Sequence, residues 1–467
     1  MVRFHGSAHP WKPYEDTIRS LGTAENTKPS RAFAMRNPQL ANLDFRKYIM
    51  NIQPPHPAEE WSGELLATKK CSICTQYYPS YSVGYLPPIP GSEDCLYLDI
   101  YAAIRKSKNT LLPVIFWIHG GANLFGSGSD LNKTLMMDRD VVVFTFNYRL
   151  GPFGFLSTGD SVVPGNMGMK DQSLALRWVW NKIQNFGGDP KRVTLFGFSS
   201  GASRGISIGG VALAPWSRMG QARDKARKMA ATVGCPTTCE TEMVNCVQTR
   251  PANLLTRALD DYLQLNDNWN DIAPHMLIFN DTIPPNQKRQ VAEETRKHYL
   301  GSEPIDRNSI IPIISMLGDR QWGYCMEKAM RLQAKRNKCP MWTYVYSYKT
   351  MYSITEALMR QTRKLGVNNG EDIYLVTVTP LMNVTWSSDV QMQQILLDIY
   401  ISFATHGEPR MPQVDWQPVN PYDKYYHYLH IVDPQRIGMD TGFDFGPRSL
   451  WDRITTIEQQ TDRIGRM

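Results

Sequence analysis

Ser199 and its neighbours are the residues in this sequence whose types and spacing could do covalent chemistry. The segment Gly197-Phe-Ser-Ser-Gly201 fits the pattern G-x-S-x-G, in which a sharp turn after a strand lifts a serine hydroxyl above the edge of a sheet. A serine in that position attacks carbonyl carbons when a nearby base removes its proton. Such a pattern arises by chance in roughly one chain of this size in six. The segments around it must therefore show whether Ser199 is a nucleophile.

Alternating strand and helix signals surround this serine. Two apolar runs predict buried strands at Leu112–Ile118 and Val141–Asn147, and Val193–Phe198 predicts a third that leads into the serine. An apolar stripe near the helical period predicts a helix over Asp171–Phe186, which the following glycines end. This alternation predicts an α/β fold with a mostly parallel central sheet and helices on both faces.

A glycine-rich loop follows the first predicted strand. It begins His119-Gly-Gly and comes before the serine in the chain. In an oxyanion hole of this kind, one N–H comes from such a loop and the other from the residue after the serine. We therefore predict that Gly120, Gly121 and Ser200 bind an oxyanion. The order of the two motifs on strand ends predicts an α/β-hydrolase fold.

Further segments resemble the type-B carboxylesterase and cholinesterase family, specifically its invertebrate esterases, from about Trp61 to Trp451. The matching segments are Ser92-Glu-Asp-Cys-Leu-Tyr-Leu-Asp, Asn147-Tyr-Arg-Leu-Gly-Pro-Phe, Gly165-Asn-Met-Gly-Met-Lys-Asp and Phe196-Gly-Phe-Ser-Ser-Gly-Ala. The resemblance implies one carboxylesterase domain over residues 56–467, locally truncated, after a poorly matching segment over residues 1–55.

The resemblance also implies two disulfides among the eight cysteines. They are Cys74–Cys95 and Cys235–Cys246. Four cysteines are left over, and both free thiols and further bridges stay open for them. These are Cys71, Cys239, Cys325 and Cys339.

The general base is the main departure from the family. The resemblance places its histidine after Gly-Val-x and before Gly and acidic residues, where this chain reads Gly366-Val-Asn-Asn-Gly-Glu-Asp and has Asn369. A carboxamide has no lone pair basic enough to take the serine proton near neutral pH. The histidines elsewhere are more typical of surface or packing positions. They are His5, His9, His56, His119, His275, His298, His406, His427 and His430.

The family's acid is also missing. The resemblance places it in a strand-Glu-Gly context between the second disulfide loop and an Asn-Trp-Asn segment. This chain runs almost directly from Cys246 to Asn266-Asp-Asn-Trp-Asn. Asp281 follows a strand-like Met276–Phe279, but it lies downstream of the acid position, and we expect it in a glycosylated turn.

A third departure lies directly after the serine. Gly205-Ile-Ser-Ile-Gly-Gly resembles the next parallel strand, but only Ser200–Arg204 separate it from Ser199. A parallel crossover needs a dozen or more residues, usually a helix. We therefore expect that the helix which seats the turn is absent, and that Ser199 has lost its scaffold as well as its base.

Composition excludes some functions and indicates a compartment. The 467 residues are 42% hydrophobic and 20% charged, and the net charge of +7 comes from scattered Lys and Arg, which disfavours nucleic-acid binding. No apolar run reaches the ~18 residues of a membrane helix. Eight cysteines and sequons at Asn132, Asn280 and Asn383 predict an extracellular protein. Met1-Val-Arg-Phe-His lacks an apolar signal segment, so we expect that the natural start is lost or altered.

These observations predict a secreted, carboxylesterase-like protein that is impaired in catalysis and uses no cofactor and no metal. It would act through its surface on an extracellular protein partner, as cholinesterase-like adhesion proteins of the family do. The alternative is an active serine hydrolase of carboxylic esters that recruits an unusual base. A product without a stable folded function is the third hypothesis.

Overall fold

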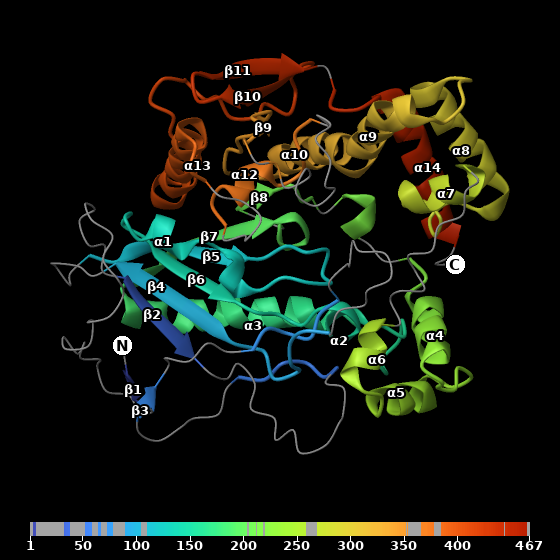
Figure 1. Cartoon of the computed structure of the whole chain (residues 1–467), viewed down its shortest axis with the longest axis horizontal. Helices are drawn as coiled ribbons and strands as arrows, with labels where there is room; N and C mark the ends of the chain where they lie inside the picture. Colours follow the sequence, from blue (N-terminus) through green and yellow to red (C-terminus); the bar gives the residue numbers. More distant parts are fainter. Residues whose placement is uncertain are drawn as a thin grey trace. The chain divides into compact units, whose positions relative to one another are not determined.

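The computed structural model describes residues 3–5, 32–37, 52–57, 64–66, 72–77, 89–103, 110–202, 205–211, 213–217, 220–257, 269–351, 353, 366–377, 384–442 and 444–464. The chain divides into two compact units, each described below by itself (Figure 1). The first unit holds residues 1–208, 222–259 and 372–410, and the second holds residues 209–221, 260–371 and 411–467. The predicted boundary near residue 55 stays a prediction.

A six-stranded mixed sheet forms the centre of the first unit, in the order β2-β4-β6-β5-β7-β8 (Figure 1). Its strands are β2 Ala32–Asn37, β4 Leu98–Ala103, β5 Leu112–Ile118, β6 Val142–Phe146, β7 Gly188–Phe198 and β8 Ile206–Ile208. Neighbours from β6 to β8 pair in parallel, whereas β4 and β2 pair antiparallel. β1 (Arg3–His5) and β3 (Glu64–Leu66) form a separate two-stranded antiparallel sheet. The expected α/β class is confirmed.

The strands that lead to the predicted site lie close to their expected positions. β5 has the predicted bounds, and β6 lies within the predicted Val141–Asn147. β7 begins at Gly188 rather than at Val193, because Leu112 of β5 pairs with Gly188 as soon as the preceding helix ends. The connection between helix and strand is therefore shorter than the sequence pattern indicates.

Two long helices cover the two faces of this sheet (Figure 1). α3 (Met167–Lys182) continues into a 3₁₀ turn, η2 (Ile183–Phe186), where a single helix over Asp171–Phe186 was predicted. α13 (Ser387–His406) lies on the other face, where the ring of Tyr400 packs at a tilt against Phe196 of β7 with ring centroids 4.9 Å apart. α13 ends at His406, one of the histidines that the sequence places outside the site.

Shorter helices complete the first unit. They are η1 Gly128–Asp130, α1 Lys133–Met136, α2 Gly151–Phe155, η3 Ser199–Gly201, α4 Ala222–Thr232, α5 Glu240–Gln248 and α6 Ala252–Arg257, while α12 Glu371–Tyr374 begins at the boundary with the second unit.

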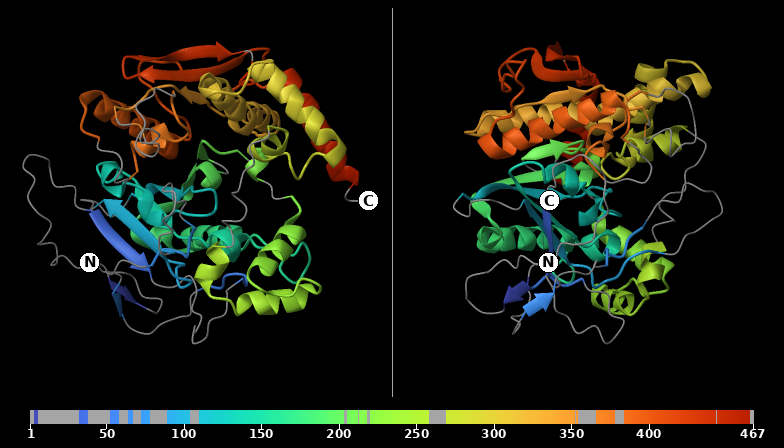
Figure 2. Two further views of the ribbon diagram at one scale, coloured as in Figure 1. Left: turned by 45° about the vertical axis from the view of Figure 1, so that its right-hand side comes forward. Right: turned by 60° about the vertical axis from the view of Figure 1, so that its left-hand side comes forward.

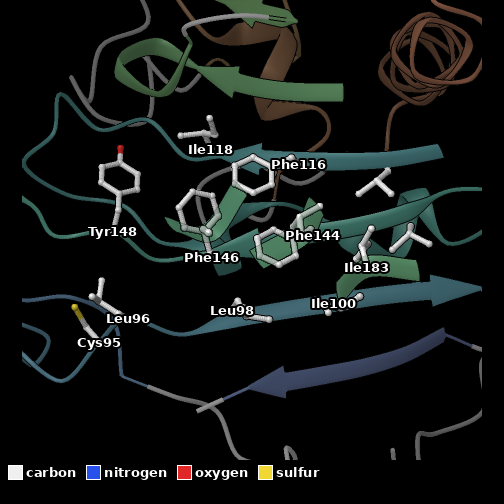
Figure 3. Close-up of a cluster of buried hydrophobic side chains, with 14 of the residues drawn as sticks. Cys95, Leu96, Leu98, Ile100, Phe116, Ile118, Phe144, Phe146, Tyr148 and Ile183 are labelled. Carbon is white, nitrogen blue, oxygen red and sulfur yellow. The ribbon is translucent and has the colours of Figure 1, made fainter. Parts of the chain in front are cut away.

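The core beside α3 is built from alternate residues of the strands (Figure 3). Phe116 of β5 stacks on Phe144 of β6 with ring centroids 5.0 Å apart. The ring of Phe146 packs against that of Phe116, with centroids 4.9 Å apart. Successive strand side chains point to opposite faces, so the neighbouring Trp117 lies on the α13 side, against Phe196. Burial of both faces explains why β5 and β6 read as continuous apolar runs.

Both implied disulfides are present in the first unit. Cys74 and Cys95 are bonded, as are Cys235 and Cys246. Among the other described cysteines, Cys325 is a buried free thiol, and Cys239 and Cys339 are exposed free thiols. Cys71 lies outside the described residues.

The second unit combines a helical bundle with a small sheet. Its helices are η4 Pro215–Ser217, α7 Trp269–Met276, α8 Pro285–Leu300, η6 Arg307–Ser309, α9 Ile310–Gly318, the π-helical η7 Asp319–Gly323, α10 Tyr324–Arg336 and α14 Arg448–Ile464. Its strands are β9 Tyr344–Tyr346, β10 Tyr426–Asp433 and β11 Arg436–Gly442, in the order β11-β10-β9. α8 and α14 run side by side (yellow and red in Figure 2), joined by an ion pair of Arg453 with Glu294 at 2.8 Å.

The strand-like interpretation of Met276–Phe279 was wrong. α7 continues to Met276, and the N–H groups of Phe279 and Asn280 then donate to the carbonyl of Pro274, which closes the helix with a turn. Ala273 and Leu277 are four positions apart and both fully buried. The apolar residues here therefore form the buried face of a helix and its closing turn rather than a strand. None of the helices within the described residues is both long and apolar enough to cross a bilayer.

A buried ion pair attaches α3 to the chain that leaves β6. The Asp171 carboxylate accepts from the Arg149 guanidinium at 2.6 and 2.9 Å and from the Arg149 backbone N–H at 3.0 Å. Both side chains are almost completely buried, with 4% and 1% of their surface exposed. Arg149 also donates to the carbonyl of Gln53 at 2.8 Å.

We predict that Asp171→Ala destabilises the protein by about 3–5 kcal/mol, because it leaves a buried guanidinium without its counter-ion. Asp398→Ala is the matched control, since Asp398 pairs with Arg139 at 2.7 Å but is 63% exposed, and it should cost below about 1 kcal/mol. Denaturant unfolding followed by circular dichroism measures both. Equal costs for the two variants would contradict the role given to burial.

Candidate active site

Ser199 stands at the end of β7 in a strained backbone conformation. Its φ angle is +51°, which a residue with a side chain rarely adopts. Phe198 before it is extended, and the 3₁₀ turn of η3 follows, with the Ala202 N–H donating to the Ser199 carbonyl at 3.0 Å. This is the backbone expected of a serine held on a sharp turn above a sheet edge.

The loop after β5 lies directly against this turn. A side-chain carbon at Gly201 would come within 2.4 Å of the Ile118 carbonyl oxygen, so only glycine fits there. At Gly120 it would come within 2.8 Å of the Phe198 carbonyl oxygen and 3.2 Å of Cβ of Ser199. The two glycines let the exits of β5 and β7 touch, which brings the predicted oxyanion loop to the predicted nucleophile.

The hydroxyl of Ser200 joins the same two segments. It accepts from the Asn123 backbone N–H at 3.2 Å and is hydrogen-bonded to the phenol of Tyr148. The Tyr148 hydroxyl in turn donates to the His119 carbonyl at 2.8 Å. Tyr148 is fully buried; burial raises the pKa of its phenol, and the hydrogen bond from Ser200 only partly opposes this. Tyr148 is thus a neutral donor that fixes the loop.

The glycine-rich loop is strained in its own right. Gly121, Ala122 and Asn123 have φ angles of +105°, +54° and +60° in succession. The Gly121 carbonyl accepts from Leu124 N–H at 2.8 Å, and the Asn123 carbonyl accepts from Gly151 N–H at 2.7 Å. Strained backbone persists only where its surroundings determine it, and these bonds supply that restraint.

His119 is buried within this loop with one ring nitrogen unpaired. Its ring is 1% exposed and stacks on Tyr148 with centroids 4.3 Å apart. Nδ1 lies 2.9 Å from the Gly120 carbonyl oxygen, so it carries the proton and leaves the lone pair on Nε2. Among the described residues Nε2 has no hydrogen-bond partner. Burial lowers the pKa of His119, opposed in part by the Asp130 carboxylate, and the imidazole is neutral near pH 7.

The expectation that Ser199 has lost its scaffold needs correction. β8 pairs in parallel with β7 as expected, and the described residues between them contain no α-helix. However, pairing starts at Phe196 with Ile206, so the chain returns by only two strand residues, or roughly 7 Å. The seven residues from Ser199 to Gly205 are long enough to cover that distance. The turn at Ser199 is held by the β5 loop and by Ser200 rather than by a following helix.

Asn369 belongs to the second unit. It lies in a turn closed by a hydrogen bond from Glu371 N–H to the Asn368 carbonyl at 3.2 Å, with Gly370 at φ +95°, as a type II turn requires. Its Oδ1 is so close to Gly209 that a Cβ there would come within 1.9 Å. Ser199, Ser200, Gly120 and Gly121 thus lie in the first unit. Asn369 lies in the second unit, where its side chain is close to Gly209.

Glu371 anchors this turn. Its carboxylate is fully buried and accepts from the hydroxyl of Thr350 at 2.8 Å and from that of Ser353 at 2.5 Å. The fold of the turn therefore depends on Glu371 and on the glycine after Asn369.

The first unit combines a glycine-rich loop, a strained serine and two disulfides on an α/β sheet. A sequence model described as the carboxylesterase family matches residues 51–283 and 264–444, which is most of the chain.

The chain belongs to the carboxylesterase family.

Relatives within the carboxylesterase family match over most of their length. A carboxylic ester hydrolase from Bombus ignitus is 44% identical over 89% of this chain and 88% of the relative. Venom carboxylesterase-6 from Apis mellifera is 40% identical over 86% of this chain and 87% of the relative. The solved structure of juvenile hormone esterase from Manduca sexta has a TM-score of 0.72, with 22% identity over 92% of this chain and 95% of that one, and so shares the fold.

The alignment with the Bombus relative runs over 495 positions, more than the 467 residues of this chain, although it covers only 89% of the chain. Gaps on the side of this chain must therefore fill many of those positions. This agrees with the expectation that whole segments of a carboxylesterase are absent here.

The remaining predicted positions are scattered. The N–H of Asn132 donates to the Val376 carbonyl at 3.1 Å, and Asn280 is half-buried, with its Oδ1 accepting from Lys288 at 2.9 Å. Asn383 lies outside the described residues. His427 and His430 lie inside β10 and not beside it, and His430 bonds to Asp440 and Ser347. Within the described residues, His, Cys, Asp and Glu do not gather into a metal-binding group.

Sequence reasoning missed Asn123 and Tyr148. Tyr148 stands in the Asn147-Tyr-Arg-Leu-Gly segment, which was noted only as a family resemblance. A tyrosine directly after a buried strand was the available signal, because a buried phenol needs a hydrogen-bond partner.

We predict that Ser199→Gly is more stable than Ser199→Ala by about 0.5–1 kcal/mol. Alanine keeps the unfavourable positive φ, whereas glycine adopts it without a steric penalty but loses more chain entropy on folding. Chemical denaturation of both variants beside the parent protein gives the difference. An alanine variant as stable as the glycine variant would mean that Ser199 is not strained.

We also predict that His119 makes stability depend on pH. The folded protein keeps this imidazole neutral because burial lowers its pKa, whereas the unfolded chain protonates it below a pKa of about 6.5. Its contribution is therefore complete above that pH and declines as the pH falls, by up to about 1.4 kcal/mol per pH unit.

His119→Phe keeps the stacking on Tyr148 and removes the titration. The stability difference between the two proteins should be constant above neutral pH and should shift in favour of the variant on acidification. Parallel stability curves for the two proteins in acid would refute the prediction.

Proposed function

We propose that this carboxylesterase-family chain does not hydrolyse esters efficiently and acts by binding an extracellular protein partner through its surface. The observation that carries the proposal is Asn369, a carboxamide at the position where the family resemblance requires the general base. Without a base the Ser199 hydroxyl stays protonated and is a poor nucleophile. On this proposal the strained turn and the oxyanion loop are kept, but the group that would accept the Ser199 proton is missing.

The missing acid supports the same proposal. In a serine triad the acid holds the imidazole in one tautomer and stabilises it when charged. α6 ends at Arg257 and α7 begins at Trp269, which leaves little chain for the strand that carries the acid in the family. The gaps against the Bombus relative are in keeping with that loss.

An extracellular location accompanies the proposal. Two disulfides persist in an oxidising compartment and are rare in the cytosol. The three sequons agree with a secretory route. A relative described as a venom carboxylesterase is in keeping with secretion as well.

One observation favours the alternative of an active ester hydrolase with an unusual base. The lone pair of His119 Nε2 is unpaired, and the next residue, Gly120, lies against Ser199. Against this, burial lowers the pKa of His119, which makes it a weaker base, and its Nδ1 has a backbone carbonyl as its partner instead of an acid.

The test is hydrolysis of short-chain aryl esters by the purified full-length chain. We expect a rate no higher than that of Ser199→Ala, because loss of the base from a serine triad costs on the order of 10⁴–10⁶ in kcat. A Ser199-dependent kcat within about tenfold of the roughly 10 s⁻¹ that is typical of enzymes would overturn the proposal.

Three variants sharpen the test. Asn369→His should stay near background, because an imidazole without its acid loses about 10⁴ in rate. If an active parent protein loses its rate in His119→Phe but not in His275→Phe, an exposed histidine of the second unit, the alternative base is identified instead. Stoichiometric labelling of Asn369→His by an organophosphate would mean that the substitution was the only defect.

A further inference from the structure

The disulfide Cys235–Cys246 joins the segment after α4 to α5 in the first unit. Cys235 follows α4, and Cys246 lies within α5. Cys235 is 7% exposed and packs in a cluster with Met229 and Val244. We call α4, α5 and the connection between them the α4–α5 hairpin.

The guanidinium of Arg250 contacts both sulfur atoms of this disulfide. Its Nε lies 3.4 Å from Sγ of Cys235, and its Nη2 lies 3.4 Å from Sγ of Cys246. Nη2 also donates to the Gly234 carbonyl at 2.9 Å, which fixes the group in place. A disulfide sulfur is a weak acceptor, so the contact gains little while the bond is intact. It would gain far more if either sulfur were a thiolate, because an adjacent Arg stabilises that anion.

A free thiol lies in the same hairpin. Cys239 is exposed and stands between the two bonded cysteines, immediately before α5. Residues 235–239 form no helix or strand. The Cys239 carbonyl accepts from the Met243 N–H in the first turn of α5 at 2.9 Å, so Cys239 must leave that turn to reach Cys235. Cys246 lies further along α5, beside Arg250.

We propose that the hairpin is a thiol–disulfide exchange switch, in which Cys239 displaces Cys246 from Cys235 and Arg250 stabilises the released sulfur. Cys239 loses its proton to solvent, and its thiolate forms a new bond to Sγ of Cys235. The electron pair of the Cys235–Cys246 bond leaves with Sγ of Cys246, which becomes a thiolate beside Arg250. One disulfide is broken and one is formed, so no external oxidant or reductant takes part.

The exchange changes what the disulfide restrains. In the present form it ties the connection after α4 to α5, whereas a Cys235–Cys239 bond closes only a short loop and releases α5. The side chain of Glu240, next to Cys239, accepts from Arg227 at 2.7 Å and lies 3.5 Å from Arg223. These ion pairs lie at the start of α5, so the release of α5 after the exchange alters the charged outer face of the hairpin. The inference does not depend on whether the chain hydrolyses esters.

The test follows the position of the free thiol in the full-length chain. The protein is held at about pH 8 to allow exchange, quenched in acid, alkylated with a maleimide and digested without reduction. Cleavage after Glu240 and Glu242 places Cys246 on a different peptide from Cys235 and Cys239. We expect label to appear on Cys246 as it disappears from Cys239, while the exposed Cys339 stays labelled as the internal reference.

Three variants and a matched control test the roles of Cys239 and Arg250. Cys239→Ser should leave Cys246 unlabelled. Arg250→Gln should slow the exchange about three- to tenfold, because a leaving thiol of higher pKa departs more slowly, and Arg250→Lys should restore part of the rate. Arg227→Gln is the matched control, since it removes a cation from the same hairpin that pairs with Glu240 instead of the sulfurs, and it should leave the rate unchanged.

The opposite results overturn the inference. Cys246 that stays unlabelled while Cys239 stays fully labelled means that no exchange occurs. Label on Cys246 in Cys239→Ser means that the disulfide opens by another route. Equal slowing by Arg227→Gln and Arg250→Gln means that the contact of Arg250 with the sulfurs has no part in it, and dimers linked through Cys239 mean that the thiol acts between molecules.

Discussion

The contact between the exits of β5 and β7 is the constraint on which the rest of the first unit depends. The parallel register of the two strands brings Ile118 beside Gly197, so the chains that leave them must pass within contact distance. Gly201 lies against the carbonyls of Ile118 and His119, and a larger residue there would force the exits apart. Given that contact, the turn at Ser199 has little freedom, and its positive φ follows from the packing around it.

This constraint separates the scaffold of the serine from its chemistry. Ser200 and Tyr148 hold the glycine-rich loop in place from within the first unit. None of these restraints involves the base or the acid of a triad. A chain of this fold can therefore lose both catalytic partners while the backbone around its serine stays in the conformation that catalysis requires. Retention of the G-x-S-x-G pattern is for the same reason weak evidence of activity.

How far the sequence predicts the structure depends on how local the determining interaction is. β5 and β6 were predicted because burial of both faces leaves an uninterrupted apolar run. Met276–Phe279 was misread because a short apolar run does not distinguish a strand from the buried face of a helix. The two disulfides were predicted from the family resemblance. The contacts that fix the turn at Ser199 could not be predicted, because they join residues as far apart in the chain as Asn123 and Ser200.

The turn at Asn369 shows why an asparagine at the proposed position of the base need not disturb the fold. Its geometry is set by Gly370, whose φ of +95° suits a type II turn, and by the buried Glu371, which Thr350 and Ser353 hold through their hydroxyls. The side chain at position 369 lies close to Gly209. An asparagine is smaller than a histidine and needs no charged partner, so the proposed substitution would remove a proton acceptor without leaving a buried charge or breaking the turn. Selection for folding alone would then tolerate Asn369, and only selection for hydrolysis would remove it.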